Sequence, residues 1–482
     1  MGWTGDAQVF SVTATYLEDT YAFYAKYLYD MWQEQQAADG CVYDVIPSTG
    51  VDSFATVWGD ASVIIPWNMY EFYGDVSILE DQYESMHSWI DFIKRYDGEN
   101  HAWGSKFHYG DWLALDHPAG GVDQVMGGTD ESFIAYVYYG AMCDLVSKAA
   151  GILGKASDCE YYKKLSDKIT AYVKREYYSA SGRCCIKTQT ALILTMKYGL
   201  SENKELCRKM IEKLFAWSDG KLRTGFVGTP LLCNVLTENG FEELSFKLLL
   251  NEEYPGWLRE VKLGATTMWE RWNTLDDEGR VTSVGMNSCN HYSYGSIAEW
   301  MFKHVAGIHK KTDSIGFRNV EITPLHNWEL QFMEGEYDSP VGKYRCSWRF
   351  LDENHVTLKV SVPFGGTAEV ILPYASSDVF TDQSNPLFAN IADGRCIVEA
   401  GDYEVTYQTV KCFREKFSIH STIRQIRNHK RAYEGLKAEF DMDVELLPKQ
   451  NDDISLSDTL LQYRKEVFDQ IGDSRNSFLM SL

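Results

Sequence analysis

The feature that most constrains this chain is the helical period of its first three hundred residues. From Asp6 to about Lys303, apolar and aromatic residues recur at spacings of three and four, the pattern of one helix face, and glycine-rich turns separate the periodic stretches. The pattern predicts helices over Asp19–Gln36, Ser77–Tyr96, Glu131–Leu153, Ser157–Tyr178, Lys187–Leu200, Ser201–Trp217 and Gly295–Ile308. Helices joined by alternating short and long loops favour helical hairpins. At this length, hairpins commonly close into an (α/α) toroid with a pocket at one end.

The period changes near Lys310, where apolar and polar residues alternate and Gly, Pro, Asn and Asp interrupt them. Alternation of this kind predicts antiparallel strands, and we expect residues 311–410 to form a β-sandwich. Two amphipathic stretches, Ser421–Phe440 and Asp458–Asp473, predict a short helical tail in residues 411–482. The expected fold class is mainly α, with domains at residues 1–310, 311–410 and 411–482.

Bulk composition narrows the classes of partner. The formal net charge of −23 argues against nucleic acid and anionic membranes, which require clustered Lys and Arg, and leaves a neutral ligand as the better fit. The 11 cysteines show no metal-ligand spacing and indicate reduced thiols. The sequence shows no signal peptide and no membrane-spanning run. We therefore expect a cytoplasmic protein without a metal or other cofactor, and the oligomeric state stays open.

One carboxylate stands out in the stretch "GATTMWERW", where Glu270 lies between Trp269 and Trp272. One interpretation is plain packing, with Arg271 as an ion-pair partner. The other is a sugar site, where indole faces stack on a pyranose and the carboxylate works at the anomeric carbon. Burying such a carboxylate unpaired is costly, so Glu270 is a candidate functional residue.

Gly, Trp and Asp also recur together in other loop-like segments. Taken alone, a loop tryptophan more often covers the core, an aspartate after glycine more often caps a helix or forms a turn, and a single histidine is usually structural. The candidates are Trp3 and Asp6 in the predicted glycine-rich turn "GWTGDAQ", Trp58 and Asp60 in "VWGDASVIIPW", Asp111 and Trp112 in "HYGDWLALD", and His291 in "NSCNHYSYGS".

Glycoside hydrolysis is one reaction that would use all of these residue types together. The reaction needs two carboxyl groups, one that protonates the departing oxygen and one that activates water or attacks carbon. Aromatic walls contact the C–H face of the ring, and aspartates accept hydrogen bonds from its hydroxyls. A pocket of low dielectric also raises a carboxyl pKa enough for acid catalysis.

The motifs occur in an order and spacing that resemble the bacterial α-L-rhamnosidases, the six-hairpin glycosidases of glycoside hydrolase family 78. The segments that carry the resemblance, between Gly2 and about Tyr407, are "GWTGDAQVF", "VWGDASVIIPW", "YGDWLALD", "TGFVGTPLL", "YPGWL", "GATTMWERW" and "NHYSYGSIAEWM". The resemblance implies an (α/α)6 barrel and hydrolysis of terminal α-L-rhamnosides with inversion at the anomeric carbon.

The resemblance also implies roles for individual residues. Glu270 would be the general base that deprotonates water. Asp6 and His291 would contact sugar hydroxyls, and Asp111 belongs to a matched motif near the sugar. The aromatic walls of the rhamnose subsite would be Trp3, Trp58 and Trp112, whose apolar faces suit the methyl group of a deoxy sugar.

The sequence departs from the family pattern at its start. In the family, a stretch of the type Asp-Cys-Pro-x-Arg-Asp-Glu-Arg, which contains the general acid, immediately precedes the Gly-Trp-Thr-Gly-Asp motif. Here Met1 alone precedes Gly2. General acid catalysis is worth about two to four orders of magnitude in rate, so we expect weak or absent hydrolysis. The alternatives are a deoxy-sugar-binding protein without turnover, a non-functional remnant, and another exo-glycosidase on the same barrel.

Overall fold

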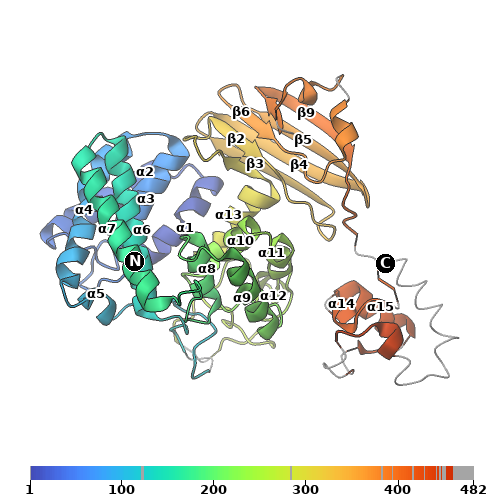
Figure 1. Ribbon diagram of the computed structural model, residues 1–482, viewed down its shortest axis with the longest axis horizontal. Helices are drawn as coiled ribbons and strands as arrows, with labels where there is room; N and C mark the ends of the chain where they lie inside the picture. The colour runs from blue at the N-terminus through green and yellow to red at the C-terminus, as the bar shows by residue number, and fades with distance from the viewer. Residues whose placement is uncertain are drawn as a thin grey trace. The chain divides into compact units, whose positions relative to one another are not determined.

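The computed structural model describes residues 2–50, 52–120, 124–282, 285–381, 384–392, 395–414, 417–418, 420–427, 429–440, 442–444, 447 and 452–459. By its internal contacts, the chain divides into two compact units. The first comprises Met1–Leu351 and His355–Gln408, and the second comprises Asp352–Asn354 and Thr409–Leu482. The first unit contains a helical region followed by two sheets (Figure 1).

The helical region consists of antiparallel helix pairs, as the periodicity predicts. For example, α6 packs along most of α7 (Figure 1). The helices are α1 (Thr4–Leu17), α2 (Tyr21–Ala37), α3 (Ala61–Tyr73), α4 (Ser77–Asp97), α5 (Ala102–Ser105), α6 (Glu131–Ile152), α7 (Ala156–Tyr177), α8 (Gln189–Lys197), α9 (Lys204–Trp217), α10 (Thr229–Glu238), α11 (Glu242–Leu249) and α12 (Trp257–Lys262), followed by the continuous helical segments η1 (Ser293–Ser296), α13 (Ile297–Trp300) and η2 (Met301–Val305).

An inner and an outer layer follow from how each helix distributes its apolar residues. Helix α7 buries only one stripe, Tyr162, Ser166, Ile169 and Val173, which is the pattern of an outer helix with one face in solvent. Helix α6 is buried on almost all sides, as expected of an inner helix. Inner helices contact one another around a ring: α1 contacts α3, α3 contacts α6, α8 contacts α10, and both α10 and α1 contact η1 and α13.

The first helix corrects one expectation. The segment "GWTGDAQ" was expected to be a glycine-rich turn, but α1 begins at Thr4, so Asp6 lies in its first helical turn. The start of this helix is held by residues 44–46: the backbone N–H of Thr4 donates to the Asp44 carbonyl at 2.9 Å, and Trp3 forms a β-bridge with Val45. This anchoring fixes the first residues of the chain against the ring.

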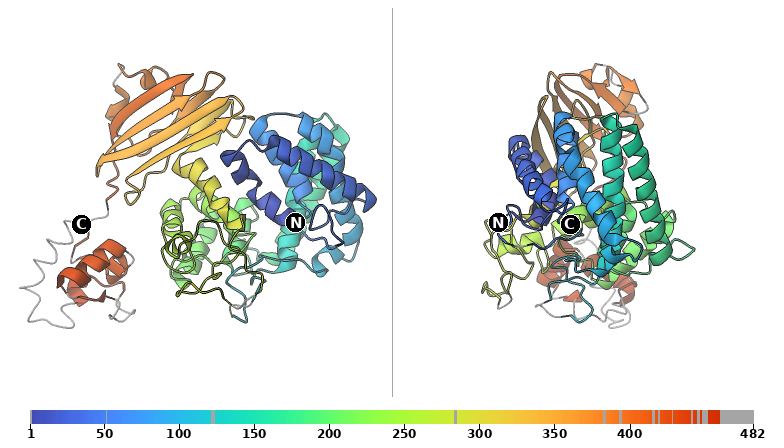
Figure 2. Two further views of the ribbon diagram at one scale, coloured as in Figure 1. Left: turned by 180° about the vertical axis from the view of Figure 1, so that it is seen from behind. Right: turned by 90° about the vertical axis from the view of Figure 1, so that its left-hand side faces the viewer.

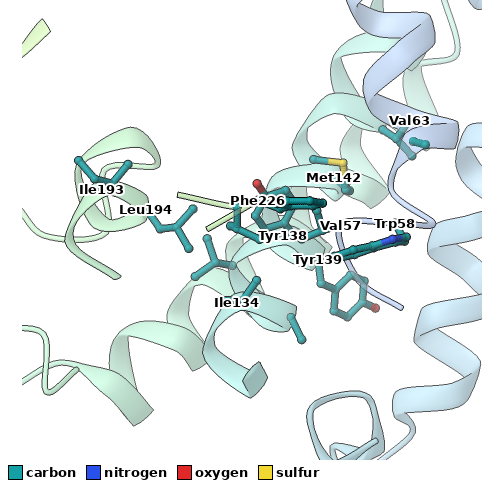
Figure 3. Packing of buried hydrophobic residues seen from close by; sticks show 14 of the residues in the cluster. Val57, Trp58, Val63, Ile134, Tyr138, Tyr139, Met142, Ile193, Leu194 and Phe226 are labelled. Atoms are coloured by element: carbon teal, nitrogen blue, oxygen red, sulfur yellow. The ribbon is translucent and has the colours of Figure 1, made fainter. Parts of the chain in front are cut away.

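The core of the ring fills the space between inner helices and the loops that precede them. Figure 3 shows side chains from α3, α6 and α8 packed together with Trp58 and Phe226, which come from loops. Close packing of large side chains from several elements leaves little room for movement. The loops that carry Trp58 and Phe226 are therefore fixed to the rigid part of the molecule.

Two sheets follow the helical region and pack as a sandwich (Figure 2). One sheet has the strand order β1-β2-β6-β8-β7 and the other β3-β4-β5-β9. The strands are β1 (Ile308–Lys310), β2 (Asn319–Ile322), β3 (Phe332–Ser339), β4 (Gly342–Asp352), β5 (His355–Val362), β6 (Thr367–Val370), β7 (Ile391–Ala392), β8 (Arg395–Val398) and β9 (Gly401–Gln408).

The predicted sandwich is confirmed, with one correction to its strand pairing. Strand β5 alternates buried and less buried residues and pairs antiparallel with β9, from His355 opposite Gln408 to Val362 opposite Gly401. Strands β2 and β6, however, pair in parallel. Strand β1 ends at Lys310 and so lies just before the residues expected to form the sandwich.

An aromatic cluster joins α1 to the sheets. The ring of Tyr16 stacks on Phe302 with centroids 5.1 Å apart and contacts Tyr337 of β3 at 5.0 Å. Its hydroxyl donates to the Ile308 carbonyl at 3.2 Å. These contacts fix the far end of α1, the helix that carries Asp6.

The second unit has a small core of its own. Helices α14 (Ile423–Arg427) and α15 (Lys430–Phe440) occupy the stretch expected to form the first tail helix, and Ile423, Ile426, Ala432 and Leu436 pack together. Most of the second expected helix, Asp458–Asp473, lies outside the described residues. Within the described part of the chain, no helix is both long and apolar enough to cross a membrane.

Candidate active site

The residues singled out in the sequence lie on segments that precede inner helices. Trp3 is the N-cap residue of α1, Trp58 precedes α3, Trp112 precedes α6, and both Glu270 and His291 precede η1. Inner helices of a hairpin barrel run in the same direction, so the segments before them gather at one end of the ring. The contacts below place several of these side chains in one site.

The carboxylate of Asp6 joins the start of α1 to the last inner segment. Ser293 Oγ donates to Asp6 Oδ1 at 3.1 Å, and His291 Nε2 lies 2.9 Å from the same oxygen. Imidazole Nδ1 accepts the backbone N–H of Ser293 at 3.5 Å, so Nε2 carries the proton that faces Asp6. Both contacts use Oδ1 of Asp6, and Oδ2 can accept a hydrogen bond from a ligand hydroxyl.

Glu270 lies close enough to the Asp6–His291 pair for its charge to act on the imidazole. Burial lowers the pKa of His291, but the hydrogen bond to Asp6 and the negative charges of Asp6 and Glu270 outweigh it, and the net pKa is raised above its ordinary value. Two carboxylates therefore act on one imidazole, which favours the charged form of the ring.

Backbone hydrogen bonds fix Glu270 relative to His291. Glu270 and Ser288 bond in both directions, because the Glu270 N–H donates to the Ser288 carbonyl and the Ser288 N–H donates to Glu270 Oε2, each at 2.9 Å. The His291 N–H donates to the Met268 carbonyl at 2.8 Å. Segments 268–270 and 288–291 therefore lie side by side. Glu270 is 8% exposed, which leaves its carboxylate at the margin of the interior.

The two tryptophans that flank Glu270 serve packing. Trp269 and Trp272 are 3% and 1% exposed. The Trp272 ring stacks on Tyr294 with centroids 4.3 Å apart and meets Trp257 edge-on at 5.2 Å. The idea that these indoles form a sugar platform is therefore wrong, and their role is to hold the Glu270 segment against the core.

The aromatic part of the site is organised around Tyr109, a residue that the sequence reasoning missed. Its ring contacts Trp58, Trp112 and Trp3 at centroid distances of 4.3, 5.5 and 6.3 Å. The three predicted wall residues thus meet at one ring. Trp58 is 3% exposed, whereas Trp3 and Trp112 are half-buried and keep open surface. The sequence did offer a signal for Tyr109, because it is an additional aromatic residue within the motif "HYGDW" that contains Trp112.

A buried carboxylate orients Tyr109. Its hydroxyl donates to Asp44 Oδ2 at 3.0 Å, and Asp44 is fully buried. Burial raises the pKa of Asp44, although hydrogen bonds from Ser53 and Tyr109 and the charge of Lys106 oppose the rise. Burial also raises the pKa of Tyr109 to about 12, so the phenol keeps its proton and remains the donor.

Direct contacts link the aromatic group to the polar group. Gly5, the residue before Asp6, packs on the indole of Trp58, and a Cβ atom at Gly5 would lie 2.6 Å from it. The N–H of Phe226 donates to the Trp112 carbonyl at 2.9 Å, while the Phe226 ring lies 5.2 Å from the His291 ring. Asp6, His291 and Glu270 therefore share one neighbourhood with the tryptophan cluster.

Asp111 is enclosed within the protein, although its motif was expected to lie near the sugar. It is fully buried, and its two oxygens accept from Thr190 Oγ1 and from the backbone N–H groups of Gly225, Val227 and Gly228. Four donors use the full acceptor capacity of a carboxylate. Burial raises its pKa, and these hydrogen bonds oppose the rise. Asp111 fixes the loop before α10 beneath Trp112.

Asp60 likewise has a structural role, and not the role of helix cap considered for it. Its side chain accepts from the Val57 N–H at 2.6 Å and from Trp89 Nε1 at 2.8 Å, and it makes no cap hydrogen bond to α3. Burial raises its pKa to about 6. These bonds hold Trp58 in place through the backbone that precedes it.

A second buried glutamate lies close to the Glu270 segment. Glu260 of α12 is 3% exposed, and its Oε2 accepts the Trp269 N–H at 3.4 Å. Burial raises its pKa to about 8, so it carries a proton at neutral pH. Nothing in the sequence pattern distinguished Glu260 from a solvated residue on a charged helix.

Within the described residues, no group of three or more His, Cys, Asp or Glu side chains could hold a metal ion. The cysteines at the ring's core, such as Cys143 and Cys233, are buried free thiols, and burial raises their pKa. The site therefore offers carboxylates, an imidazole and aromatic faces as its chemical groups.

A helical ring with carboxylates and aromatic walls at one end is the architecture of the six-hairpin glycosidases. The family model of the bacterial α-L-rhamnosidase six-hairpin glycosidase domain matches residues 1–305, and that of the bacterial α-L-rhamnosidase C-terminal domain matches residues 307–385. The chain belongs to the bacterial α-L-rhamnosidase family, and the expected (α/α)6 fold is confirmed.

Curated relatives and solved structures support the same assignment. An α-L-rhamnosidase of Alteromonas sp. (strain LOR) is 35% identical over 381 residues, 77% of this chain and 40% of the relative. The crystal structure of the Streptomyces avermitilis α-L-rhamnosidase complexed with L-rhamnose has a TM-score of 0.74 at 32% identity, over 84% of this chain and 38% of that one. The Aspergillus terreus α-L-rhamnosidase structure has a TM-score of 0.74 at 27% identity, over 85% and 46%. The chain thus spans about 40% of the length of its curated relatives.

Proposed function

We propose that this chain contains the barrel and the C-terminal sheet domain of an α-L-rhamnosidase that acts on terminal α-L-rhamnosides with inversion. One observation carries the proposal: Asp6, His291 and Glu270 meet beside the Trp3, Trp58 and Trp112 cluster at one end of the ring. The family relationship supports it, as does the L-rhamnose bound by the Streptomyces avermitilis relative.

In the proposed reaction, Glu270 is the general base that takes a proton from the attacking water. Its hydrogen bond from the Ser288 N–H stabilises the carboxylate and orients it, and the other oxygen receives the proton. Asp6 accepts a hydrogen bond from a sugar hydroxyl through Oδ2, while the Nε2–H of His291 donates to Oδ1. Trp3 and Trp112 present apolar surface to the ring and methyl group, and Trp58 supports them from behind.

Inversion also requires a general acid on the leaving-group side. The family pattern places that acid ahead of the Gly-Trp-Thr-Gly-Asp motif, and we assign no residue of these 482 to the role. For this chain alone we expect slow hydrolysis and a steep dependence on the leaving group. An aryl rhamnoside with an acidic phenol needs no proton on departure, whereas a disaccharide does.

The test compares a set of aryl α-L-rhamnosides whose phenols differ in pKa. We expect the rate to rise steeply as the phenol becomes more acidic, and Glu270→Gln to lower it by about two to four orders of magnitude. Glu278→Gln, in an exposed position of the same loop, is the matched control. Equal rates across the set, or an unaffected Glu270→Gln variant, would count against the proposal.

Calorimetry with L-rhamnose separates the proposal from its main alternative. The Asp6–His291 pair, in which Asp6 Oδ2 is left open to a ligand hydroxyl, is also compatible with binding alone. Binding of L-rhamnose without hydrolysis of any aryl rhamnoside would identify a deoxy-sugar-binding protein instead. Absence of both would indicate a non-functional barrel, and hydrolysis of other aryl glycosides would indicate a different exo-glycosidase.

A further inference from the structure

A cavity of about 390 Å³ borders the candidate active site without including Glu270. Four segments line it: residues 113–120 with Gln124, residues 217–223 at the end of α9, residues 254–255 before α12, and residues 271–273. Its volume lies in the range of small-molecule sites. None of the functions assigned above uses it.

Chain connectivity places this cavity next to the proposed rhamnose subsite. Arg271 lines the cavity and is bonded to Glu270, and Leu113 lines it and is bonded to Trp112. Consecutive Cα atoms are about 3.8 Å apart. The cavity wall at Arg271 therefore begins next to Glu270, and the wall at Leu113 begins next to Trp112. All four segments also precede inner helices or α12, at the end of the ring where the site lies.

The lining combines exposed aromatic faces with fixed polar groups. Trp217 is 82% exposed and Tyr254 is 37% exposed. Arg223 donates from one guanidinium nitrogen to the Leu115 carbonyl at 2.9 Å, which fixes the side chain while further N–H groups remain for a ligand. The Trp217 indole therefore presents an accessible aromatic face at the edge of the cavity, a surface on which a sugar ring can stack.

Saccharides match this chemistry better than other ligand classes. A pyranose offers apolar C–H faces to aromatic rings and hydroxyls to planar polar groups along its edge. The formal net charge of −23 disfavours polyanions. A terminal rhamnose held by the tryptophan cluster must also direct its glycosidic oxygen toward the next sugar unit, and this cavity is lined by the residues that follow Trp112 and Glu270.

We propose that this cavity is the subsite for the sugar unit to which rhamnose is attached, with Trp217 as its stacking platform. The inference rests on the proposed function, because it assumes that rhamnose occupies the neighbouring hollow. It assigns the chain a preference for a rhamnosyl saccharide over free rhamnose.

Calorimetry on the full chain tests the inference with two probes, L-rhamnose and rutinose, in which L-rhamnose is α-linked to D-glucose. We expect rutinose to bind more tightly than L-rhamnose. Trp217→Ala should weaken rutinose binding by about tenfold and leave L-rhamnose binding unchanged. Trp217→Phe keeps an aromatic face and should retain most of the affinity. Phe364→Ala, at a side chain that is 99% exposed on the sheet domain, is the control and should change neither.

The outcomes distinguish the two proposals. Two results would contradict the second subsite but leave the rhamnose site intact. One is that rutinose binds no more tightly than L-rhamnose, and the other is that Trp217→Ala weakens the binding of both probes equally. If the unmodified chain binds neither probe, both proposals fail. Because Trp217 is largely in solvent, loss of folding does not explain an effect confined to rutinose.

Discussion

His291 Nε2 lies 2.9 Å from Asp6 Oδ1, although the two residues come from opposite ends of the helical region. The contact exists because the ring closes there, where α1 packs against η1 and α13. The same contact therefore closes the helical ring and forms part of the site. Asp6 Oδ1 also accepts a hydrogen bond from the Ser293 hydroxyl, and Asp6 Oδ2 is left for a ligand.

Replacing Asp6 by Asn should lower the pKa of His291. The carboxylate supplies most of the interaction that outweighs burial, so burial should dominate in the variant and hold the pKa of His291 below its ordinary value of about 6.5. When folding raises the pKa of a group, the group stabilises the folded state. This stabilisation is complete below the pKa of the unfolded state and is lost as the pH rises through the pKa of the folded state. The stability deficit of Asp6→Asn should therefore be largest below about pH 6.5 and should shrink as the pH rises above that value.

NMR titration of the His291 ring in both proteins measures the shift directly. Urea unfolding at several pH values measures the stability. An unchanged His291 pKa in Asp6→Asn would contradict the pairing seen in the structure.

Replacing Glu260 by Gln should flatten the pH dependence of stability. Burial raises the pKa of this carboxyl from 4.5 to about 8, so the folded state holds a proton that the unfolded state releases. The stabilisation is complete below about pH 4.5 and declines up to about pH 8, at about 1.4 kcal/mol per pH unit for this group alone. Gln has no proton to lose.

The free energy of unfolding should therefore rise for Glu260→Gln relative to the unmodified chain between pH 5 and pH 8. Urea denaturation across that range measures it, with Glu278→Gln as the exposed control. Parallel curves for the unmodified chain and Glu260→Gln would show that Glu260 ionises normally.

Removing one hydroxyl from the aromatic cluster should destabilise the fold. Tyr109→Phe leaves the fully buried Asp44 without its phenol donor, and an unsatisfied buried acceptor costs about 1–3 kcal/mol. Tyr29→Phe, at a side chain that is 56% exposed, should change stability little. Chemical denaturation of both variants measures the difference, and equal effects would mean that the Tyr109–Asp44 bond contributes no net stability.

Adding one methyl group at Gly5 should disturb the sugar wall. The Cβ of Gly5→Ala would lie 2.6 Å from the indole of Trp58, so the ring must shift, and overpacking of this kind costs about 1–3 kcal/mol. L-rhamnose binding should weaken as well, because the displaced indole contacts Tyr109, and the Tyr109 ring in turn contacts Trp112. Gly285→Ala, which meets nothing within 4 Å, is the control. Normal stability and normal L-rhamnose binding in Gly5→Ala would show that the position of Trp58 does not affect the proposed rhamnose site.

Local patterns predicted the fold well where an element is long and its periodicity strong. Helices α4, α6 and α7 lie within one residue of the predicted bounds, because apolar faces of about twenty residues leave little ambiguity. Helix α1 was missed because Gly2 and Gly5 suggested a turn. Gly5 is required instead by the close approach of Trp58, a contact across more than fifty residues that no local pattern contains.

The sequence motifs named residues that the structure brings together, but they did not distinguish open side chains from enclosed ones. Asp6 and Asp111 both follow a glycine in similar motifs, yet the first keeps an oxygen open and the second is enclosed by four donors. Three of those donors come from residues 225–228, which only the folded chain brings to Asp111. For the same reason, the parallel pairing of β2 with β6 is invisible in strand alternation.

The most direct test of the account is a crystal structure of the chain soaked with L-rhamnose. We predict the sugar in the hollow beside Asp6, Glu270 and His291, with a hydroxyl within hydrogen-bond distance of Asp6 Oδ2 and its methyl group against Trp3 or Trp112. An empty hollow at saturating L-rhamnose, or a sugar bound only at another face of the ring, would contradict the account.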